Sequence, residues 1–353
     1  MTNRNQEMDY QYDVTIGIPV YNVEKHIRQT MDSALAQTFQ SIEFLICDDC
    51  GTDSSIDIVK EYQQTHPRGK DIRIVHQPRN MGIGEARNRL IDEARGRFLY
   101  FLDADDMITP NAIELLFSKA QEHKAELVYG SFERLYVNGD ARRTEQCIYP
   151  SRVFTQPDEY AVYAYKAYNY GVHRMNWNYL VSLEVVRSCP LRVTPLSHGY
   201  GEDFTFTVDL PTYFTRVVLL SDVTYQYYIE EELFASKRKK VMSRQQMDLA
   251  IDSLDKKKRR AELKGRRYYA MRMARLLMYD YSFVGQILSR RDEPEPRYTD
   301  QEIQHVMWCP MSLGEALAAG SCRKQLLVAW LLNRLPAALA VRMMSLVNRV
   351  PKR

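Results

Sequence analysis

The stretch RFLYFLDADDMITP, residues 97–110, joins a run of apolar residues to a cluster of carboxylates. Its FLYFL segment has the length and the apolar continuity of a strand that is buried on both faces. Asp103, Asp105 and Asp106 follow within four positions, and the Thr-Pro pair after them is a typical start of a helix. The stretch therefore predicts a buried strand, a polar loop and a helix in direct succession.

Short apolar runs and helical patterns alternate in the same way between residue 14 and about residue 136. The expected strands are 14–20, 42–47, 72–76, 98–102 and 126–132, and the expected helices are 24–36, 54–65, 84–95 and 110–123. Strict alternation of strand and helix implies crossover connections, which build a mostly parallel sheet with helices on both faces. The predicted fold class is α/β, with a Rossmann-like sheet.

Polar residues collect where three of these strands end. Tyr21 and Asn22 follow the first strand, Asp49 follows the second, and the Asp103 cluster follows the fourth. In sheets of this kind, ligands bind outside the carboxyl ends of the strands. We therefore expect three loops to meet in one cleft that holds a ligand.

Composition limits the class of protein. The chain has 353 residues, 45% hydrophobic and 26% charged, which fits a folded chain of one large domain or two smaller ones. A net charge of +3 does not indicate a general nucleic-acid binder. The first residues lack the apolar segment of a secretory signal, so a cytoplasmic protein is expected.

The cysteines give only a weak signal. Cys47 and Cys50 form a CxxC pair, which can be a redox pair or half of a zinc site, but no second CxxC and no closely spaced pair of histidines accompanies it. The alternative is that both thiols simply flank Asp48 and Asp49.

The carboxylates of the DADD segment suit a divalent cation. Crowded carboxylates repel one another, and a cation removes that repulsion. Mg²⁺ and Mn²⁺ take oxygen ligands, usually one or two carboxylates together with phosphates of a substrate. The segment from Asp103 to Asp106 therefore looks like half of a metal–diphosphate site. The alternative is a helix N-terminus, where the helix dipole favours acidic residues.

Five motifs together make a specific resemblance. IPVYN (18–22), DDCGTDSS (48–55), NMGIGEARN (80–88), FLDADD (101–106) and GED (201–203) occur in this order. In order and spacing, over roughly the first 235 residues, they resemble glycosyltransferase family 2. The resemblance implies an inverting, nucleotide-sugar-dependent enzyme with the GT-A fold and a metal cofactor, Mn²⁺ or Mg²⁺.

The resemblance also implies roles for single residues. The nucleobase would pack on Pro19, Tyr21 and Asn22, and Asp49 would hydrogen-bond the base, commonly uracil. The donor pocket would also include Gly82, Arg87, Asn88, Asp103, Ala104 and Asp105, with Asp105 and Asp103 in the metal-binding DxD motif. Asp203 falls where the family keeps its catalytic base, and the adjacent Glu202 is the rival for that role.

These roles agree with the chemistry of sugar transfer. A nucleoside diphosphate leaves an anomeric carbon more readily when a cation neutralises its charge, and inversion then needs one base that takes the proton of the acceptor hydroxyl. The expected division is a nucleotide-sugar-binding half (1–136), an acceptor-binding half with the base (137–235) and a basic helical extension (236–353). The expected reaction builds a polysaccharide or a lipid-linked glycan.

Several segments leave alternatives open. Lys237–Lys240 can form a lid over the diphosphate or a solvated face. The tyrosine-rich segment 160–180, with Trp177, can stack on sugar rings or build a core. Loop 290–302 is the best candidate for a linker.

Two other enzyme classes fit less well. Gly82 and Gly84 imitate part of a dinucleotide fingerprint, but Arg87 occupies the third glycine position, which excludes an NAD site. A sugar-phosphate nucleotidylyltransferase would need a glycine- and lysine-rich first loop, and VTIGIPVYN has none. A catalytically silent nucleotide-binding scaffold at the membrane remains an alternative.

The C-terminal residues 321–353 are apolar, contain seven basic residues and contain no acidic residue. Arg334 and Pro336 interrupt the apolar run, so a membrane-spanning helix is not expected. The segment predicts a pair of basic amphipathic helices that either lies on an anionic membrane surface or packs on the protein. The protein would then be either free in the cytoplasm or peripheral on the cytoplasmic face of the membrane.

Overall fold

The computed structural model describes residues 10–139, 141–166, 175–195, 202–231, 242–290 and 298–348. They belong to two compact units. The first consists of Met1–Tyr160 and Arg174–Val241, and the second consists of Ala161–His173 and Met242–Arg353. The functional division expected from the sequence, with boundaries at 136 and 235, concerns donor and acceptor binding and remains a prediction.

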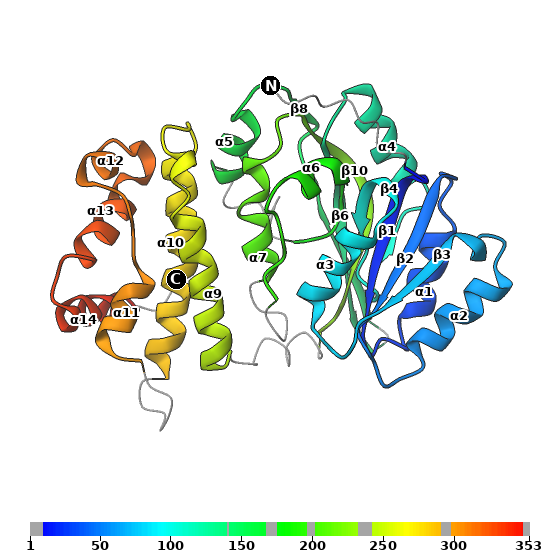
Figure 1. Ribbon diagram of the computed structural model, residues 1–353, viewed down its shortest axis with the longest axis horizontal. Helices are drawn as coiled ribbons and strands as arrows, with labels where there is room; N and C mark the ends of the chain where they lie inside the picture. Colours follow the sequence, from blue (N-terminus) through cyan, green and yellow to red (C-terminus); the bar gives the residue numbers. More distant parts are fainter. Residues whose placement is uncertain are drawn as a thin grey trace. The chain divides into compact units, whose positions relative to one another are not determined.

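The first unit is built on a sheet of ten strands among the described residues (Figure 1). The strands are β1 (Tyr12–Val20), β2 (Ile42–Asp48), β3 (Ile72–His76), β4 (Gly96–Phe101), β5 (Met107–Ile108), β6 (Leu127–Asn138), β7 (Ala141–Cys147), β8 (Arg152–Phe154), β9 (Tyr179–Ser182) and β10 (Val217–Glu230). Their order is β3-β2-β1-β4-β9-β6-β10-β5, with β7 paired to β6 and β8 paired to β10. The five strands predicted from the sequence are confirmed as β1, β2, β3, β4 and β6.

Strand direction changes along the sheet. β3, β2, β1 and β4 are mutually parallel, as their continuous apolar sequences predict. β9 lies antiparallel between β4 and β6, and β10 is parallel to β6 but antiparallel to β5 and β8. The sheet is therefore parallel in its N-terminal half and mixed in the remainder.

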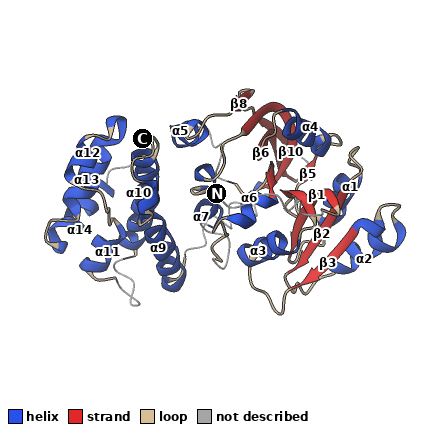
Figure 2. Cartoon of the chain, turned by 45° about the horizontal axis from the view of Figure 1, so that its top comes forward, coloured by secondary structure: helices blue, strands red, loops and turns tan. Residues whose placement is uncertain are grey.

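Helices cover both faces of this sheet (Figure 2). The helices of the first unit are α1 (Ile27–Leu35), α2 (Ser55–Thr65), α3 (Ile83–Glu93), α4 (Ala112–Glu122), α6 (Leu183–Ser188) and α7 (Glu202–Thr207), with α5 (Glu159–Lys166) at its boundary. α1 packs on α2, and Phe117 of α4 contacts Phe39 just after α1. α3 packs on β1, β2 and α6 on the other face. The α/β class and the four predicted helices are confirmed.

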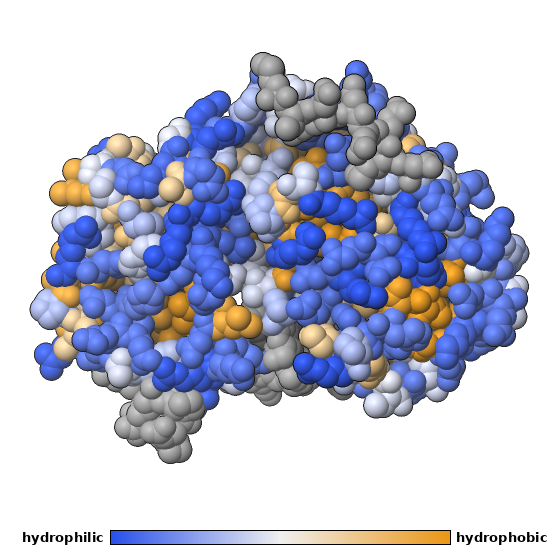
Figure 3. All heavy atoms as spheres, viewed as in Figure 1, coloured by the Kyte–Doolittle hydropathy of each residue, from blue (hydrophilic) through white to orange (hydrophobic). Residues whose placement is uncertain are grey.

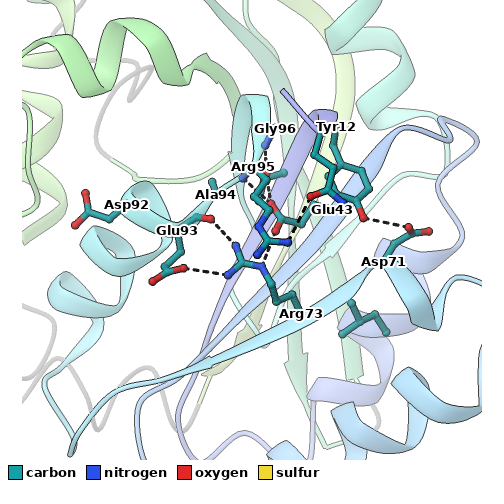
Figure 4. A network of polar contacts seen from close by, with 12 residues as sticks. Tyr12, Glu43, Asp71, Arg73, Asp92, Glu93, Ala94, Arg95 and Gly96 are labelled. Carbon is teal, nitrogen blue, oxygen red and sulfur yellow. Dashed lines mark hydrogen bonds and ion pairs between the residues drawn. The ribbon is translucent and has the colours of Figure 1, made fainter. Parts of the chain in front are cut away.

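A buried carboxylate fastens the amino end of the sheet (Figure 4). Glu43 of β2 is 1% exposed. It accepts hydrogen bonds from the Thr15 hydroxyl at 2.7 Å, the Arg95 backbone N–H at 2.8 Å and the Arg73 Nε–H at 2.9 Å. Arg73 also pairs with the Glu93 carboxylate at 3.0 Å. The network thus ties β1, β2 and β3 to the turn between α3 and β4, at the edge opposite to the strand ends that carry the candidate site.

The second unit is helical in its described part. Its helices are α9 (Arg244–Lys258), α10 (Tyr269–Ser289), α11 (Asp300–Val306), α12 (Leu313–Leu317), α13 (Arg323–Leu332) and α14 (Ala337–Asn348). α10 packs on α9, α11, α13 and α14. The predicted helical extension is therefore present, and most of the expected linker 290–302 lies outside the described residues. No helix within the described ranges is long and apolar enough to span a bilayer.

A buried ion-pair cluster holds this unit together. The Lys258 ammonium is fully buried and pairs with Asp255 at 2.8 Å and with Asp280 at 2.9 Å. It also donates a hydrogen bond to the Trp308 carbonyl at 3.1 Å. Burial raises the pKa of Asp280 to about 7, and the neighbouring Lys258 opposes that rise. The basic run that begins at Lys256 is thus not simply a solvated face, because its third lysine is a core residue.

The aromatic residues of segment 160–180 that the structure describes build a core. Trp177 is 4% exposed and stacks on Tyr225, with ring centroids 4.3 Å apart and planes at 7°. Tyr160, Tyr165 and Tyr179 are also buried. Of the two expectations for this segment, the described residues support core packing.

Candidate active site

Three parallel strands end at one edge of the sheet and bring their loops together. Val20 at the end of β1 lies beside Asp48 at the end of β2, and the Leu102 N–H after β4 donates to the Gly17 carbonyl. Tyr21, Asp49 and Asp103 therefore begin loops at the same edge, as the alternation of strands and helices predicts.

The three acidic side chains of the DADD segment have different environments. Asp106 is fully buried, accepts a hydrogen bond from the Tyr225 hydroxyl at 2.6 Å and accepts another from the Tyr228 N–H at 2.8 Å. Burial raises its pKa well above the ordinary value. Asp105 is half-buried, whereas Ala104 is buried, and its carbonyl accepts a hydrogen bond from the Thr30 hydroxyl. Asp106 thus holds the loop on β10, and Asp103 and Asp105 remain as candidate ligand-binding carboxylates.

Arg87 joins two carboxylates that are far apart in the sequence. Its Nη2 donates to Asp103 Oδ1 and its Nη1 donates to Asp203 Oδ1, each at 2.8 Å. The Arg87 side chain is 2% exposed, whereas those of Asp103 and Asp203 are 20% and 32% exposed. The guanidinium therefore lies beneath two carboxylates that reach the surface, and it fixes the distance between the DxD loop and α7.

Electrostatics couple this group to Glu202. Burial alone would lower the pKa of Arg87, but Asp103 and Asp203 outweigh burial and raise it, so the guanidinium stays charged. Burial raises the pKa of Asp203, and Arg87 opposes the rise. Burial and the adjacent Asp203 raise the pKa of Glu202 to about 7. The buried Arg87 guanidinium thus interacts with three carboxyl groups, those of Asp103, Asp203 and Glu202. The Glu202 carboxyl is expected to titrate near neutral pH.

Asp49 fastens the loop that begins α3. It is 3% exposed, and its two carboxylate oxygens accept hydrogen bonds from the backbone N–H groups of Met81 at 2.7 Å and Gly82 at 2.8 Å. Gly82 has φ of 86°, a conformation that glycine adopts without strain. The visible role of Asp49 is to position this loop, and contact with a base remains a prediction.

The residues expected around the nucleobase differ in exposure. Tyr21 is 45% exposed, so its ring is accessible to a ligand. Asn22 has φ of 52° and its side-chain oxygen accepts a hydrogen bond from the Thr52 N–H at 2.7 Å, which joins the loops after β1 and β2. Pro19 is buried within β1 beside Cys47. Tyr21 is thus the accessible member of the three, and the other two shape the backbone.

Asn88 and Gly84 attach α3 to the segment before α7. The Asn88 side chain donates to the Val193 carbonyl and accepts from the Val193 N–H, both at 2.9 Å. A Cβ on Gly84 would lie 2.9 Å from the Thr194 carbonyl oxygen. These contacts fix the position of α3, and with it the position of Arg87, whereas contact between Asn88 and the donor remains a prediction.

Part of the expected site lies outside the described residues. This holds for Gly201 of the GED motif, for His198 and for the proposed lid Lys237–Lys240. Cys47 and Cys50 are free thiols, and burial raises the pKa of Cys47 to about 12. No group of three or more His, Cys, Asp or Glu side chains in the described ranges is arranged to hold a metal ion.

Two contributions were not foreseen from the sequence. Tyr225 and Tyr228 of β10 hold Asp106, although they lie about 120 positions away. Arg87 was expected to line the donor pocket, but its pairing with both aspartates was not expected. The only sequence signal was an arginine on the buried face of a helix, where a charged side chain needs partners of opposite charge.

The arrangement suits the transfer of a group from a polyanionic donor. An accessible aromatic ring, the carboxylates of Asp103 and Asp105 and a further carboxylate on α7 lie at one edge of the sheet. The Arg87 bridge places the third carboxylate beside the DxD loop. Such an arrangement can bind a nucleotide and present a base to a second substrate.

Comparison with known proteins finds relatives that carry the name glycosyltransferase. Glycosyltransferase GlyA of Streptococcus pneumoniae serotype 4 is 34% identical over 120 residues, which are 34% of this chain and 16% of GlyA. The uncharacterized glycosyltransferase EpsJ of Bacillus subtilis (strain 168) is 30% identical over 222 residues, 61% of this chain and 60% of EpsJ. The chain spans less than two thirds of the length of these relatives.

A solved structure and a family model extend the comparison. S. aureus TarS 1–349 in complex with UDP has a TM-score of 0.62 at 18% identity, with 96% of this chain and 91% of that chain covered. The fold is the GT-A fold, as predicted. Residues 15–182 match the model described as Glycosyl transferase family 2. This matched part of the chain confirms the resemblance to glycosyl transferase family 2 that the sequence motifs indicated.

Proposed function

We propose that the chain transfers a sugar from a nucleotide-sugar, with a UDP-sugar as the expected donor, to a hydroxyl of a glycan or lipid-linked acceptor with inversion of the anomeric carbon. The observation that carries the proposal is the Arg87 bridge. It joins Asp103 of the DxD loop to Asp203 of α7 through two bonds of 2.8 Å. A base is thereby kept at a fixed place beside the loop that would hold the diphosphate.

The residues of the DxD loop fit a divalent cation. Asp105 is half-buried at the ligand edge of the sheet, and Asp103 is partly exposed beside it. Mg²⁺ or Mn²⁺ commonly takes only one or two carboxylates from the protein when a diphosphate supplies further oxygens. Asp105 would be the principal ligand, with Asp103 assisting. When bound, the cation would neutralise the charge of the leaving diphosphate.

The remaining chemistry belongs to the side chains of the chain itself. Asp203 takes the proton of the acceptor hydroxyl, the acceptor oxygen forms a bond to the anomeric carbon, and the bond to the nucleoside diphosphate breaks. Burial raises the pKa of Asp203, and the charge of Arg87 opposes this rise and so favours the ionised carboxylate. Glu202 is the weaker candidate for the base, because burial raises its pKa to about 7 and its side chain is 4% exposed.

The relatives support the choice of donor and the class of reaction. A neighbour with 18% identity, TarS, was solved with UDP, and the two curated relatives carry the name glycosyltransferase. The exposed ring of Tyr21 and the buried Asp49, which follow neighbouring strands, are the residues expected to contact the nucleoside. We expect this reaction in the cytoplasm or on the cytoplasmic face of the membrane.

A thermal-shift panel tests the donor site. UDP, GDP, CMP and dTDP are each added with and without Mn²⁺ to the wild type and to Asp105→Ala. UDP at a hundred times its dissociation constant should stabilise the wild type by about 2.7 kcal/mol. The Mn²⁺ enhancement should disappear in Asp105→Ala, while Asp222→Asn on the exposed part of β10 serves as a control that keeps it.

An assay of nucleotide-sugar turnover, run beside this panel, separates the enzyme from a silent scaffold. UDP binding followed by turnover of a UDP-sugar supports transfer. UDP binding without turnover of any nucleotide-sugar would favour a nucleotide-binding scaffold. Absence of a shift with every nucleotide would refute the proposed donor site.

A further inference from the structure

The last two described helices expose basic side chains and no acidic ones. Within residues 321–348, the charged residues are Arg323, Lys324, Arg334 and Arg342. All four are exposed. Arg334 lies in the short connection between α13 and α14, and its guanidinium stacks over the Trp330 ring at 4.0 Å. The segment therefore presents positive charge along both helices and at the turn between them.

α14 carries two sets of apolar residues, one buried and one exposed. Ala340, Val341 and Met344 are buried and account for its packing on the unit. Next to this buried side, Leu339, Met343 and Val347 recur at every fourth position and are 46%, 37% and 61% exposed, with Leu346 beside them at 66%. A helix that only completes a core needs only the buried apolar residues, so the exposed set adds apolar surface beyond what this packing requires.

α13 and α12 continue the exposed apolar surface. Val328 and Leu331 of α13 are 53% and 42% exposed and follow Lys324 at spacings that place all three on one side of the helix. Leu313 and Leu317 of α12, one turn apart, are 43% and 48% exposed. Figures 1 and 2 both show α12, α13 and α14 along the same edge of the helical unit. Figure 3 shows apolar atoms at the surface of this edge, interspersed with hydrophilic ones.

This concentration is unusual within the chain. Among the described residues, twelve large hydrophobic side chains are exposed, and eight of them lie between Leu313 and Val347. Single exposed apolar residues are normal, whereas a group of them indicates an interaction surface. We call the exposed side of α13 and α14 the C-terminal face.

We propose that the C-terminal face binds an anionic lipid surface, with both helices lying in the plane of the interface. Exposed leucine, valine and methionine side chains would enter the acyl boundary, and the four cations would contact the lipid phosphates. Neither helix is long enough to cross a bilayer: α14 has 12 residues and α13 has 10.

Charge favours lipid over a second copy of the chain. In a symmetric dimer the same patch would occur on both partners, which would place arginines against arginines without an acidic residue to pair with them. An anionic leaflet instead supplies the complementary charge. Membrane binding by this face does not depend on sugar transfer, so its test is independent of the proposed function.

Co-sedimentation of the full chain with vesicles tests the proposal. The protein is mixed at low salt with phosphatidylcholine vesicles that contain or lack phosphatidylglycerol. Binding should require phosphatidylglycerol. Each Lys or Arg near an anionic surface contributes about 1 kcal/mol, or about fivefold in partition, so Arg334→Gln with Arg342→Gln should reduce partition about 30-fold.

Matched variants keep the test specific. Lys25→Gln with Arg142→Gln changes the net charge equally at exposed positions of the first unit and should bind as the wild type does. Met343→Ser with Leu346→Ser removes apolar contacts and should also weaken binding. Circular dichroism and melting temperature check that each variant folds.

Three results would overturn the proposal. The first is no sedimentation with phosphatidylglycerol vesicles, and the second is equal sedimentation with both vesicle types. The third is a concentration-dependent dimer in analytical ultracentrifugation that Met343→Ser with Leu346→Ser dissociates, because the C-terminal face would then be an interface between copies of the chain.

Discussion

Replacing Arg87 by methionine should destabilise the first unit and disrupt the candidate site together. Methionine keeps a similar length and removes the charge. The change leaves Asp103 and Asp203 without the guanidinium that now bonds each of them at 2.8 Å. Because the Arg87 side chain is 2% exposed, water does not take over its place without rearrangement.

The expected loss of stability is large. Removing one partner of a buried ion pair costs about 3–5 kcal/mol, because charge is left uncompensated. For domains of about 150–250 residues, 1 kcal/mol corresponds to about 2–4 °C in melting temperature. We therefore expect the melting temperature of Arg87→Met to fall by about 6–20 °C.

The loss should depend on pH. Arg87 lowers the pKa of Asp203 and opposes the effect of burial, so the pKa of Asp203 rises further in the variant. A carboxyl whose pKa is raised in the folded state stabilises that state below its unfolded pKa, and this contribution is lost as the pH rises through the folded pKa. The stability difference between variant and wild type should therefore be greatest at pH 7 and above, and it should shrink as the pH falls toward 4.

Denaturant unfolding at several pH values measures both effects. Arg89→Met is the matched control, because Arg89 lies two positions further along the same helix, is 45% exposed and pairs only at the surface with Glu93. Its loss should stay within about 0.5 kcal/mol. A loss below about 1 kcal/mol in Arg87→Met, or a loss independent of pH, would show that the buried pair does not hold the site together.

Three further predictions concern buried titratable side chains other than Arg87. Lys258→Met should lower the free energy of unfolding of the helical unit by about 3–5 kcal/mol, measured by denaturant unfolding. The control Lys256→Met, at a position that is 74% exposed, should lower it by less than about 1 kcal/mol. Equal losses in the two variants would contradict the argument from burial. Glu43→Gln should lower the free energy of unfolding by about 1–3 kcal/mol, because the NH₂ group of the amide cannot accept the hydrogen bonds that a carboxylate oxygen accepts. The control Glu61→Gln, in an exposed ion pair, should be nearly neutral. An unchanged stability of Glu43→Gln would refute the role of the network. Burial raises the pKa of Glu202 to about 7, so this residue should stabilise the folded state below about pH 4.5, and that stability should be lost as the pH rises through about 7. Glu202→Gln should therefore remove this part of the pH dependence of the free energy of unfolding. An unchanged pH profile would contradict the raised pKa.

The sequence predicted the N-terminal half of the fold well because its signals are local. Continuous apolar runs bounded by turn residues mark strands buried on both faces, and all five expected strands formed. Helix boundaries were less accurate. The Thr109-Pro110 signal placed the last helix at 110, but α4 begins at Ala112, because Met107–Ile108 pairs with β10 and the Thr109 N–H donates to Thr224. That extended pairing is a contact across more than 100 residues, which no local pattern shows.

The remaining strands depend on long-range pairing of the same kind. β9 is four residues long and pairs antiparallel with both β4 and β6, and β7 is exposed along most of its length. Neither strand has the continuous apolar pattern that marks β1. Their formation is decided by neighbouring strands, which local propensity does not reveal.

The sequence predicted which residues form the candidate site better than it predicted the contacts between their side chains. Strand ends located Tyr21, Asp49 and Asp103 at one edge, and motif order added Asp203 and Arg87 through the family resemblance. The sequence did not show that Arg87 bonds both aspartates. Such a bridge depends on the packing of α3 against the segment before α7, which only the three-dimensional structure shows.

Sugar transfer by Asp203→Asn, compared with UDP binding by the same protein, tests the central claim most directly. The account predicts UDP affinity like that of the wild type and a transfer rate lower by at least about 100-fold, since a general base contributes about 10²–10⁴-fold. Asp222→Asn, at an exposed position of β10, should change neither quantity. Transfer at the wild-type rate by Asp203→Asn would contradict the account and remove Asp203 as the base.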